Sequence, residues 1–250
     1  TGMYTPMFWG IADRDQILDL FEELSGGRVY HIYNIPGGVR RDHPEGWLQR
    51  VADTIDYIES RLPDYDNLLF HNQVFVQRAR GIGAISQQDA LDWAVTGPNL
   101  RACGLAFDVR RDDPYLVYDR LDFEIPTEEA GDAWARILVR RSELFESIRI
   151  IRQCLERLPS IPGPIRCPIP NPLAWNVPAG SVYTRVESSQ GELAWYVVSD
   201  GSERPYRTHV RGPSQMHAVQ VLEKLSTGAR IEDVAQIMFS LDACPPEVDR

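Results

Sequence analysis

The sequence predicts a mainly helical α+β protein, with a helical bundle followed by a small antiparallel β meander near the C-terminus. Apolar residues recur at helical spacing through most of the first 158 residues. Seven prolines between positions 159 and 178 then interrupt any helix. Three β-rich runs follow, and the turns between them hold Gly191 and Asp200-Gly201, a dipeptide typical of hairpins.

These observations divide the chain into three expected parts. Residues 1–158 are the helical bundle portion, residues 159–180 a proline-rich linker, and residues 181–250 the β meander with closing helices and a buried tail. Hydrophobic residues make up 43% of the chain and charged residues 25%, which is typical of a globular protein and not of a disordered one.

Three helices are expected in the first third of the chain. Asp13 is placed to cap the first helix, and Gly26 to end it. Pro44 is typical of the first turn of the second helix, whose apolar face stops before Pro63. The third helix is predicted over about residues 64–75.

The middle of the chain contains one capping signal and one long helix. Ser86 with Asp89 resembles a capping box, which opens a helix that runs to Gly97. Residues 97–126 show no regular periodicity and are predicted to be irregular. The longest helix is expected from Thr127 to about residue 158, and it is most typical of the centre of a bundle.

The last seventy residues are expected to hold three strands and two helices. Ser214 is placed to cap the first of these helices, which ends at Gly228, and the second covers about Ile231–Leu241. The strands are predicted at Ser181–Glu187, Glu192–Ser199 and Pro205–Arg211.

Charge and cysteine spacing exclude several function classes. A net charge of −10 argues against nucleic-acid binding, which needs a basic face. No run of 18 apolar residues is present, so this segment is not predicted to span a membrane. The four cysteines form no Cys-x-x-Cys pair, so no metal site or redox pair is predicted.

Three local patterns suggest chemistry. Gly81-Ile82-Gly83 resembles a dinucleotide fingerprint, but a plain turn is favoured because no βαβ unit follows. Cys103 lies in a glycine-flanked loop near Arg101, which could lower a thiol pKa, but a small buried residue is the favoured interpretation. His31 lies between two tyrosines, a cluster suited to proton handling.

Six segments carry a joint pattern when they are taken in this order: Arg28–Val39, Thr96–Gly104, Tyr196–Ser202, Arg204–Arg207, Ser240–Asp242 and Glu247–Arg250. Together they resemble the quinone-site D-type chain, also called the 49 kDa subunit, of respiratory complex I, the proton-pumping NADH:quinone oxidoreductase. The resemblance runs over essentially the whole chain and covers the C-terminal portion of that family. We therefore expect a longer protein whose N-terminal part, with the His and Tyr that contact the quinone headgroup, is absent from these residues.

The resemblance implies the fold of the nickel–iron hydrogenase large subunit, from which the family descends. Hydrogenases end in an Asp-Pro-Cys-x-x-Cys pattern that ligates nickel. In this chain Cys244 keeps the first cysteine, but Glu247 stands at the second position. A nickel–iron site needs its full set of thiolates, so the tail resembles a complex I subunit and no metal ligand is expected.

The same resemblance implies the site residues. Cys244 and Pro245 would line the quinone cavity. Tyr30 and His31 would be the catalytic candidates, on a loop that faces the terminal iron–sulfur cluster of a partner subunit. The family usually has His at the position of Tyr30 and often Arg near the position of Ile35. Loss of a cation near a cluster lowers its reduction potential, so a lower-potential donor or acceptor is predicted.

The function implied is that of one subunit of a quinone-reducing translocase, inactive in isolation. Quinone would be the substrate, and the iron–sulfur cluster would belong to a partner and not to this chain. The partners would be other complex I subunits, especially the iron–sulfur subunit and those of the membrane arm, with the chain peripheral on the cytoplasmic side of the cell membrane. Two alternatives remain open: a deazaflavin- or ferredoxin-fed dehydrogenase, and a non-catalytic scaffold paralogue.

Overall fold

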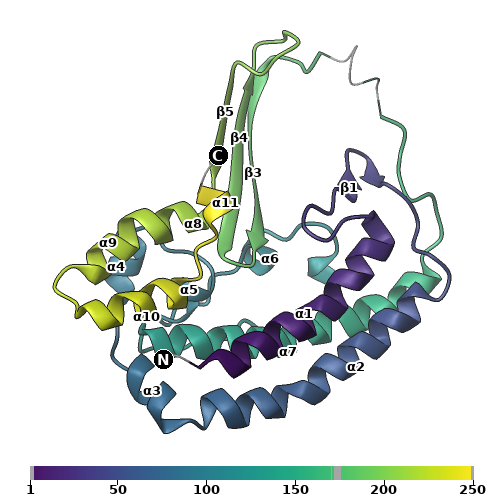
Figure 1. Ribbon diagram of the computed structural model, residues 1–250. Coiled ribbons are helices and arrows are strands. Elements are labelled where there is room, and N and C mark those ends of the chain that lie inside the picture. Colours follow the sequence, from purple (N-terminus) through teal and green to yellow (C-terminus); the bar gives the residue numbers. More distant parts are fainter. Residues whose placement is uncertain (1–2, 170, 172–175, 249–250) are drawn as a thin grey trace. The chain divides into compact units, whose positions relative to one another are not determined.

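The computed structural model describes residues 3–169, 171 and 176–248. The chain divides into two compact units: unit 1 comprises residues 1–73 and 148–175, and unit 2 comprises residues 74–147 and 176–250. The long helix α7 (Ala133–Arg157) gives part of its length to each unit (Figure 1). The boundaries fall after residue 73, within α7, and within the proline-rich linker predicted over residues 159–180.

Unit 1 is built mainly from helices. Its core is made by Val51, Ile55 and Leu62, which lie on one face of the second helix and pack against Ile148 of α7. The elements are α1 (Tyr4–Ser25), β1 (Asn34–Ile35), β2 (Gly38–Val39), α2 (Trp47–Tyr65), the π-helical turn η1 (Asp66–Phe70), the end of α7 and the 3-10 turn η3 (Leu158–Ser160).

Asp13 does not cap a helix, so that prediction is wrong. Helix α1 begins at Tyr4, and Asp13 lies inside it as a buried residue. Its carboxylate accepts hydrogen bonds from the hydroxyls of Tyr57 at 2.8 Å and Tyr65 at 2.6 Å. A buried carboxylate needs such partners, and here α2 supplies them. Gly26 does end α1, with φ at 84°.

The second helix does not stop before Pro63. Helix α2 includes this proline and ends at Tyr65. Pro63 cannot donate a backbone hydrogen bond, but its neighbour Leu62 is buried in the unit 1 core, and this packing offsets the loss. The residues of the predicted helix over 64–75 are instead divided among the end of α2, the turn η1 and the start of α3.

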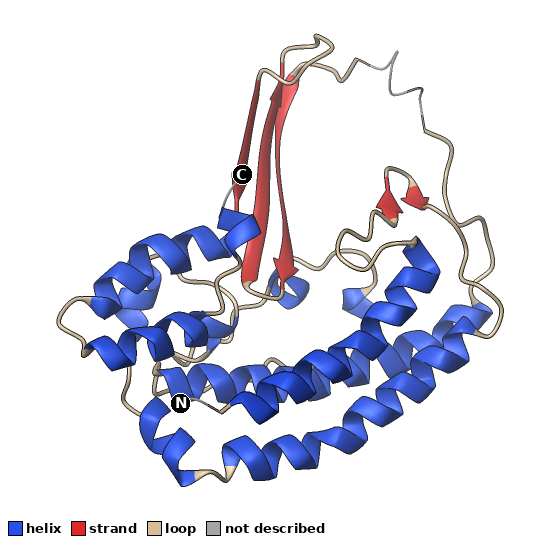
Figure 2. Ribbon diagram, viewed as in Figure 1, coloured by secondary structure: helices blue, strands red, loops and turns tan. Residues whose placement is uncertain are grey.

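Unit 2 contains the antiparallel meander that the sequence predicts. Its three strands pair in the order β3-β4-β5 and are drawn in red in Figure 2. The elements of the unit are α3 (Gln73–Ala79), α4 (Gln87–Asp92), α5 (Pro98–Arg101), α6 (Val109–Asp112), η2 (Tyr118–Arg120), the start of α7, β3 (Gly180–Ser188), β4 (Gly191–Ser199), β5 (Arg207–Arg211), α8 (Pro213–Gln215), the π-helical segment η4 (Met216–Val221), α9 (Leu222–Ser226), α10 (Ile231–Leu241) and α11 (Pro245–Val248).

Side chains cap the first turns of two helices in unit 2, one at the predicted position and one at a later position. The Ser86 hydroxyl accepts a hydrogen bond from the Asp89 N–H at 3.1 Å, which confirms Ser86 as the helix cap, although α4 already ends at Asp92. Helix α7 begins at Ala133 and not at Thr127, and the Asp132 carboxylate accepts from the Ala135 N–H at 2.8 Å. A carboxylate there satisfies an N–H group that the first turn leaves without a partner.

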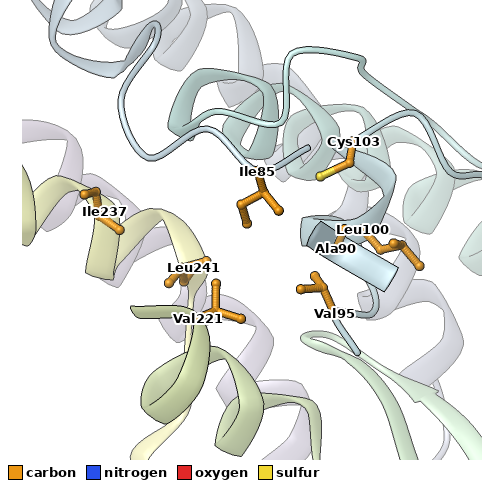
Figure 3. Close-up of a cluster of buried hydrophobic side chains, with 8 residues drawn as sticks. All are labelled: Ile85, Ala90, Val95, Leu100, Cys103, Val221, Ile237 and Leu241. Carbon is orange, nitrogen blue, oxygen red and sulfur yellow. The ribbon is translucent and has the colours of Figure 1, made fainter. Parts of the chain in front are cut away.

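The core of unit 2 joins segments that lie far apart in the sequence. Figure 3 shows apolar side chains from the α4–α5 region facing those of η4 and α10. A close approach fixes α5 against the hairpin: a Cβ on Gly97, whose φ is 66°, would lie 2.4 Å from the Gly191 Cα. The cluster consists of Ile85, Ala90, Val95, Leu100, Cys103, Val221, Ile237 and Leu241.

Gly81 and Gly83 form a plain turn. The Gly81 N–H donates to the Asp132 carboxylate at 2.7 Å, and a Cβ on Gly83 would lie 2.9 Å from Ile237. Gly83 thus lets α10 pack closely against this turn. Among the described residues, none of the helices combines the length and apolar character needed to cross a membrane.

Candidate functional site

The C-terminal tail borders a cavity in unit 2. Helix α10 ends at Leu241, and the next residue, Asp242, has a left-handed backbone with φ at 54° that turns the chain into the tail. The cavity has a volume of about 270 Å³ and is called the tail cavity below. Its lining is apolar except for one histidine. The lining residues are His217, Ala218, Leu222, Met238, Leu241, Ala243, Pro245 and Val248.

The two tail residues predicted to form a quinone cavity occupy different positions. Pro245 is part of the lining of the tail cavity, whereas Cys244 is not. The Cys244 N–H donates to the Ser214 hydroxyl at 3.0 Å, and that hydroxyl donates to the Glu247 carboxylate. Ser214 therefore ties the tail to α8 and does not cap its helix as predicted. Asp249 and Arg250 of the resembling motif lie outside the described residues.

A buried polar network lies behind the tail cavity. Asn99 and His217 are both fully buried, and the Asn99 Nδ2 lies 3.1 Å from the His217 Nδ1. Arg140 donates to the Asn99 Oδ1 at 3.0 Å and to the carbonyls of Ser240 and Leu241. The network thus connects α5, η4 and the end of α10, and it fixes the polar groups next to the tail.

His217 is uncharged in this network. Burial is the main cause that lowers the pKa of its imidazole to about 3, and the charges of Arg140, Arg211 and Arg136 act in the same direction. The sequence suggested a surface or satisfied core histidine, and the structure shows a buried one. In the sequence, His217 is marked only by its position among apolar residues after the third predicted strand. This position does not reveal that its hydrogen-bond partner, Asn99, lies 118 positions away.

A second buried cluster centres on Arg101 at the end of α5. Its side chain is 2% exposed, and its guanidinium lies 2.7 Å from a Glu143 oxygen, 2.9 Å from Glu187 and 3.4 Å from Asp108. Burial raises the pKa of Glu187, and the Arg101 charge opposes that rise. The three carboxylates come from three different parts of the chain, so this cluster holds α5 to α7 and to β3.

Tyr30 and His31 lie on the loop between α1 and β1 in unit 1. Tyr30 is 78% exposed. The His31 Nδ1 lies 2.8 Å from the Gly27 carbonyl, so it donates, and the ring stacks on Phe21 with centroids 4.4 Å apart. A neutral ring fixed in this way keeps Nε2 as its acceptor nitrogen. The role of both residues in catalysis stays a prediction.

Close packing of the backbone explains why Gly37 and Gly38 follow this loop. The β1–β2 hairpin pairs Ile35 with Gly38, and the Gly37 carbonyl accepts from the Cys167 N–H at 2.9 Å. A Cβ on Gly38 would lie 2.3 Å from the Ile165 carbonyl oxygen. The proline-rich segment therefore passes directly against the hairpin.

The predicted site residues are divided between the two units. Tyr30 and His31 belong to unit 1, and Cys244 and Pro245 to unit 2.

Cys103 has none of the properties of a nucleophile. Its side chain is 1% exposed, and burial raises the pKa of its thiol to about 11. Arg101, which could have lowered this pKa, is instead bound to carboxylates. The interpretation as a small buried residue agrees with this placement.

We expect iodoacetamide at pH 8 to label Cys103 far more slowly than Cys167 in the folded protein. Cys167 is exposed, whereas a thiol with a pKa of about 11 is only about one part in a thousand thiolate at this pH. Mass spectrometry of tryptic peptides would measure both rates. The urea-unfolded protein is the control, in which both cysteines should react alike. Equal rates in the folded protein would contradict the buried position.

The similarity to known proteins extends over the whole chain. The family model for the 49 Kd subunit of respiratory-chain NADH dehydrogenase matches residues 1–173 and 171–250. The D-type chain of the NADH-quinone oxidoreductase of Thermosipho melanesiensis is 47% identical, and that of Syntrophobacter fumaroxidans is 43% identical. All of this chain is covered in both cases, together with 68% and 66% of the respective relatives.

One solved structure is similar in both sequence and fold. It is that of the membrane-bound sulfane sulfur reductase, an archaeal respiratory membrane complex. One of its chains is 50% identical to this protein and superposes with a TM-score of 0.94, over 100% of this chain and 68% of that chain. This chain thus spans about two thirds of the length of its relatives.

These matches define the class of protein as a subunit of respiratory complex I-type oxidoreductases. The chain belongs to the family of 49 kDa subunits of respiratory-chain NADH dehydrogenase, whose bacterial members are the D-type chains of NADH-quinone oxidoreductase. The resemblance found in the sequence is therefore confirmed.

Proposed function

We propose that this chain forms part of the electron-acceptor site of a complex I-type respiratory oxidoreductase, and that a quinone binds in the tail cavity. The observation that carries the proposal is the apolar lining of that cavity beside Pro245, in a chain of the 49 kDa family. An apolar cavity with a single polar group is suited to a neutral ring that must be oriented. The nickel–iron hydrogenase large-subunit fold, implied by the resemblance, is part of this proposal.

Electrons would reach the quinone from an iron–sulfur cluster in a partner subunit. The assignment of the cluster to a partner, and not to this chain, follows from the resemblance to the 49 kDa family. The exposed loop with Tyr30 and His31 would face that cluster. When bound, the cluster supplies electrons one at a time, and quinone reduction takes two electrons and two protons.

The residues of this chain would bind and orient the quinone. The apolar walls would contact its ring, and the hydrogen bond from the Cys244 N–H to the Ser214 hydroxyl fixes the tail beside the cavity. The partners would be the iron–sulfur subunit and membrane-arm subunits, with the chain peripheral on the cytoplasmic side of the membrane. In this assignment the chain contributes to an enzyme but has no activity alone.

A second candidate acceptor is sulfane sulfur. It is favoured by the 50% identity and the TM-score of 0.94 to a chain of the membrane-bound sulfane sulfur reductase. The tail cavity argues for the quinone, since a polysulfide anion would have to be desolvated among apolar side chains without a cationic lining residue. Reduced ferredoxin and NADH are both candidate donors, and the missing cation at Ile35 still predicts a low-potential one.

We expect Ala243→Phe to lower quinone reduction by the purified complex at least tenfold, because the added ring occupies the tail cavity. Reduction of a short-chain quinone would be measured with NADH and with reduced ferredoxin, and polysulfide reduction in parallel. Ferricyanide reduction by the upstream clusters should be unchanged. Ala179→Phe, at an exposed position outside the cavity, is the matched control.

The outcomes separate the candidates. A loss of quinone reduction in Ala243→Phe alone supports the proposal. Unchanged quinone reduction in this variant would show that the quinone does not occupy the tail cavity. A complex that reduces polysulfide but no quinone would establish the sulfane-sulfur function, and a complex without either activity would indicate the scaffold paralogue.

A further inference from the structure

A tight turn between α6 and η2 exposes two apolar side chains. The Tyr118 N–H donates to the Tyr115 carbonyl at 3.2 Å, which closes the turn over Leu116 and Val117. Leu116 has φ at 54°, and Val117 has φ at −119° and ψ at 10°. Glycine usually occupies the first central position of such a turn, because a positive φ strains a residue that has a Cβ. The residues Tyr115–Tyr118 are called the exposed turn below.

Packing within the described residues does not offset this strain. The Leu116 side chain is 85% exposed, and Val117 beside it is also exposed. Neither residue belongs to a cluster of buried apolar side chains in the described part of the chain. Strained residues persist where the surrounding structure imposes them, and they cluster at functional sites. An exposed leucine with this backbone therefore indicates a contact outside the chain.

The residues on either side hold the exposed turn in place. The Tyr115 hydroxyl accepts from the Glu187 N–H at 3.2 Å and donates to the Glu187 carbonyl at 3.4 Å, so it is fixed to the edge of β3. The rings of Tyr115 and Tyr118 meet edge to face with centroids 5.0 Å apart, and Arg110 lies over the Tyr118 ring. The exposed turn is thus fixed before a partner binds, so little ordering entropy remains to be lost on binding.

Acidic side chains surround the apolar pair. Residues 111–124 contain five acidic side chains and two arginines. Asp113 and Asp119, on either side of the exposed turn, are both exposed. Arg185 lies 3.0 Å from Asp113 and Arg120 lies 4.0 Å from Asp119, which leaves the segment acidic on balance. An acidic surface is attracted to a basic protein surface and repelled by anionic lipid headgroups. The complementary surface is therefore an apolar pocket with lysine or arginine side chains at its rim.

We propose that the exposed turn anchors another subunit of the respiratory complex, and that Leu116 inserts into an apolar pocket with a basic rim on that subunit. Burial of the side chain there removes apolar surface from water and offsets the strain of the backbone. The inference rests on membership of the family of complex I-type subunits and not on the quinone assignment.

The test follows subunit loss when the intact purified complex is diluted from micromolar to nanomolar concentration. Leu116→Gly and Leu116→Asn both suit the left-handed backbone but remove the apolar side chain. Native mass spectrometry would identify the subunit that dissociates and give its Kd. We expect this Kd to rise about tenfold in both variants, equal to about 1.4 kcal/mol. Leu116→Met keeps an apolar side chain, so its Kd should rise less than about threefold.

The matched control is Leu91→Ala, which shortens another exposed leucine of unit 2, on α4. This variant should not change the Kd. A purely structural role of Leu116 predicts that Leu116→Gly is at least as stable in the complex as the unmodified chain, because glycine relieves the strain. An unchanged Kd in both Leu116→Gly and Leu116→Asn would overturn the inference.

The salt dependence of the Kd tests the charge of the partner. In the unmodified complex the Kd should rise between about 0.05 M and about 0.5 M salt, because screening weakens the pairs at the rim. Asp119→Asn should make this rise smaller. A Kd that falls with salt, or does not respond to it, would contradict a basic rim.

Photo-cross-linking identifies what the side chain touches. With Leu116→p-benzoylphenylalanine in the intact complex, irradiation should join this chain to the same subunit that dissociates on dilution. Cross-links to lipid alone, or none to another subunit, would overturn the inference. If this variant does not assemble, the dilution of Leu116→Gly and Leu116→Asn decides. Unchanged quinone reduction in Ala243→Phe would refute the proposed function and leave this subunit contact untouched.

Discussion

Arg101→Met is expected to lower the Tm of the purified protein by about 10 °C at pH 7, and by clearly less at pH 5. The side chain is 2% exposed and pairs with Glu143, Glu187 and Asp108. Removing the central cation of a buried cluster leaves its carboxylates poorly compensated, which costs about 3–5 kcal/mol. Thermal unfolding followed by circular dichroism would measure the change.

The pH dependence follows from Glu187. Burial already raises its pKa above the unfolded value, and Arg101 works against that rise, so the pKa rises further in the variant. When the pKa of a carboxyl is higher in the folded than in the unfolded state, its protonated form stabilises the folded state. This stabilisation is lost as the pH rises through the pKa of the folded state. The deficit of the variant should therefore be largest at pH 7 and shrink towards pH 5.

Arg120→Met is the control for this prediction. Arg120 is 75% exposed at the side chain, and its pair with Asp119 spans 4.0 Å. Exposed pairs contribute little, so the Tm should change by no more than about 2 °C. A similar loss in both variants, or a deficit of Arg101→Met that grows towards pH 5, would contradict the account of the buried cluster.

Local signals in the sequence predicted the elements that local interactions determine. The last helix was predicted over Ile231–Leu241 and has these same bounds. The strand expected at Glu192–Ser199 begins one residue earlier, at Gly191. Alternating apolar residues and the Asp200-Gly201 turn suffice for such elements, because their pairing partners are adjacent in the chain.

The predictions are wrong where a side chain expected to cap its own helix forms hydrogen bonds with residues far away in the sequence instead. Asp13 and Ser214 are both good capping residues by type. In the structure, the carboxylate of Asp13 binds two tyrosines of α2, and the hydroxyl of Ser214 binds the tail 30 positions later. A capping preference of about 1 kcal/mol is easily exceeded by such tertiary contacts.

The candidate site could be predicted only in part for the same reason. The resemblance led to the tail, and Pro245 does line a cavity there. The network behind the cavity was missed, because Asn99 and His217 are 118 positions apart and neither has a recognisable motif around it. A buried polar pair of this kind is visible only when the fold brings its members together.

Arg136→Met is expected to destabilise the protein by about 3 kcal/mol and to loosen the end of α10. Arg136 is fully buried and donates to the Ser240 hydroxyl at 2.9 and 3.1 Å and to the carbonyls of Gly83 and Gly131 at 2.9 and 2.7 Å. The variant leaves these buried acceptors without their donor, at about 1–3 kcal/mol each, and regains part of the cost of burying a cation.

The pH dependence of this variant should differ from that of Arg101→Met. Burial, followed by the Arg140 charge, lowers the pKa of Arg136 to about 10, so the folded state holds this proton less tightly than the unfolded state. The free-energy cost of burying this charge falls only above about pH 10, where Arg136 loses its proton in the folded state. The loss of unfolding free energy in Arg136→Met should therefore be constant from pH 5 to pH 8.

Hydrogen–deuterium exchange would locate the effect, with faster exchange expected in α10 and in the tail. Arg136→Lys should be destabilised almost as much, because an ammonium group cannot reach three acceptors in a fixed fork. Arg230→Met, just before α10, is the matched control. If Arg136→Lys were as stable as the unmodified protein, the positive charge alone, and not the forked geometry of the guanidinium, would fix Ser240. The end of α10 beside the tail cavity would then be held by electrostatic attraction and not by directed hydrogen bonds.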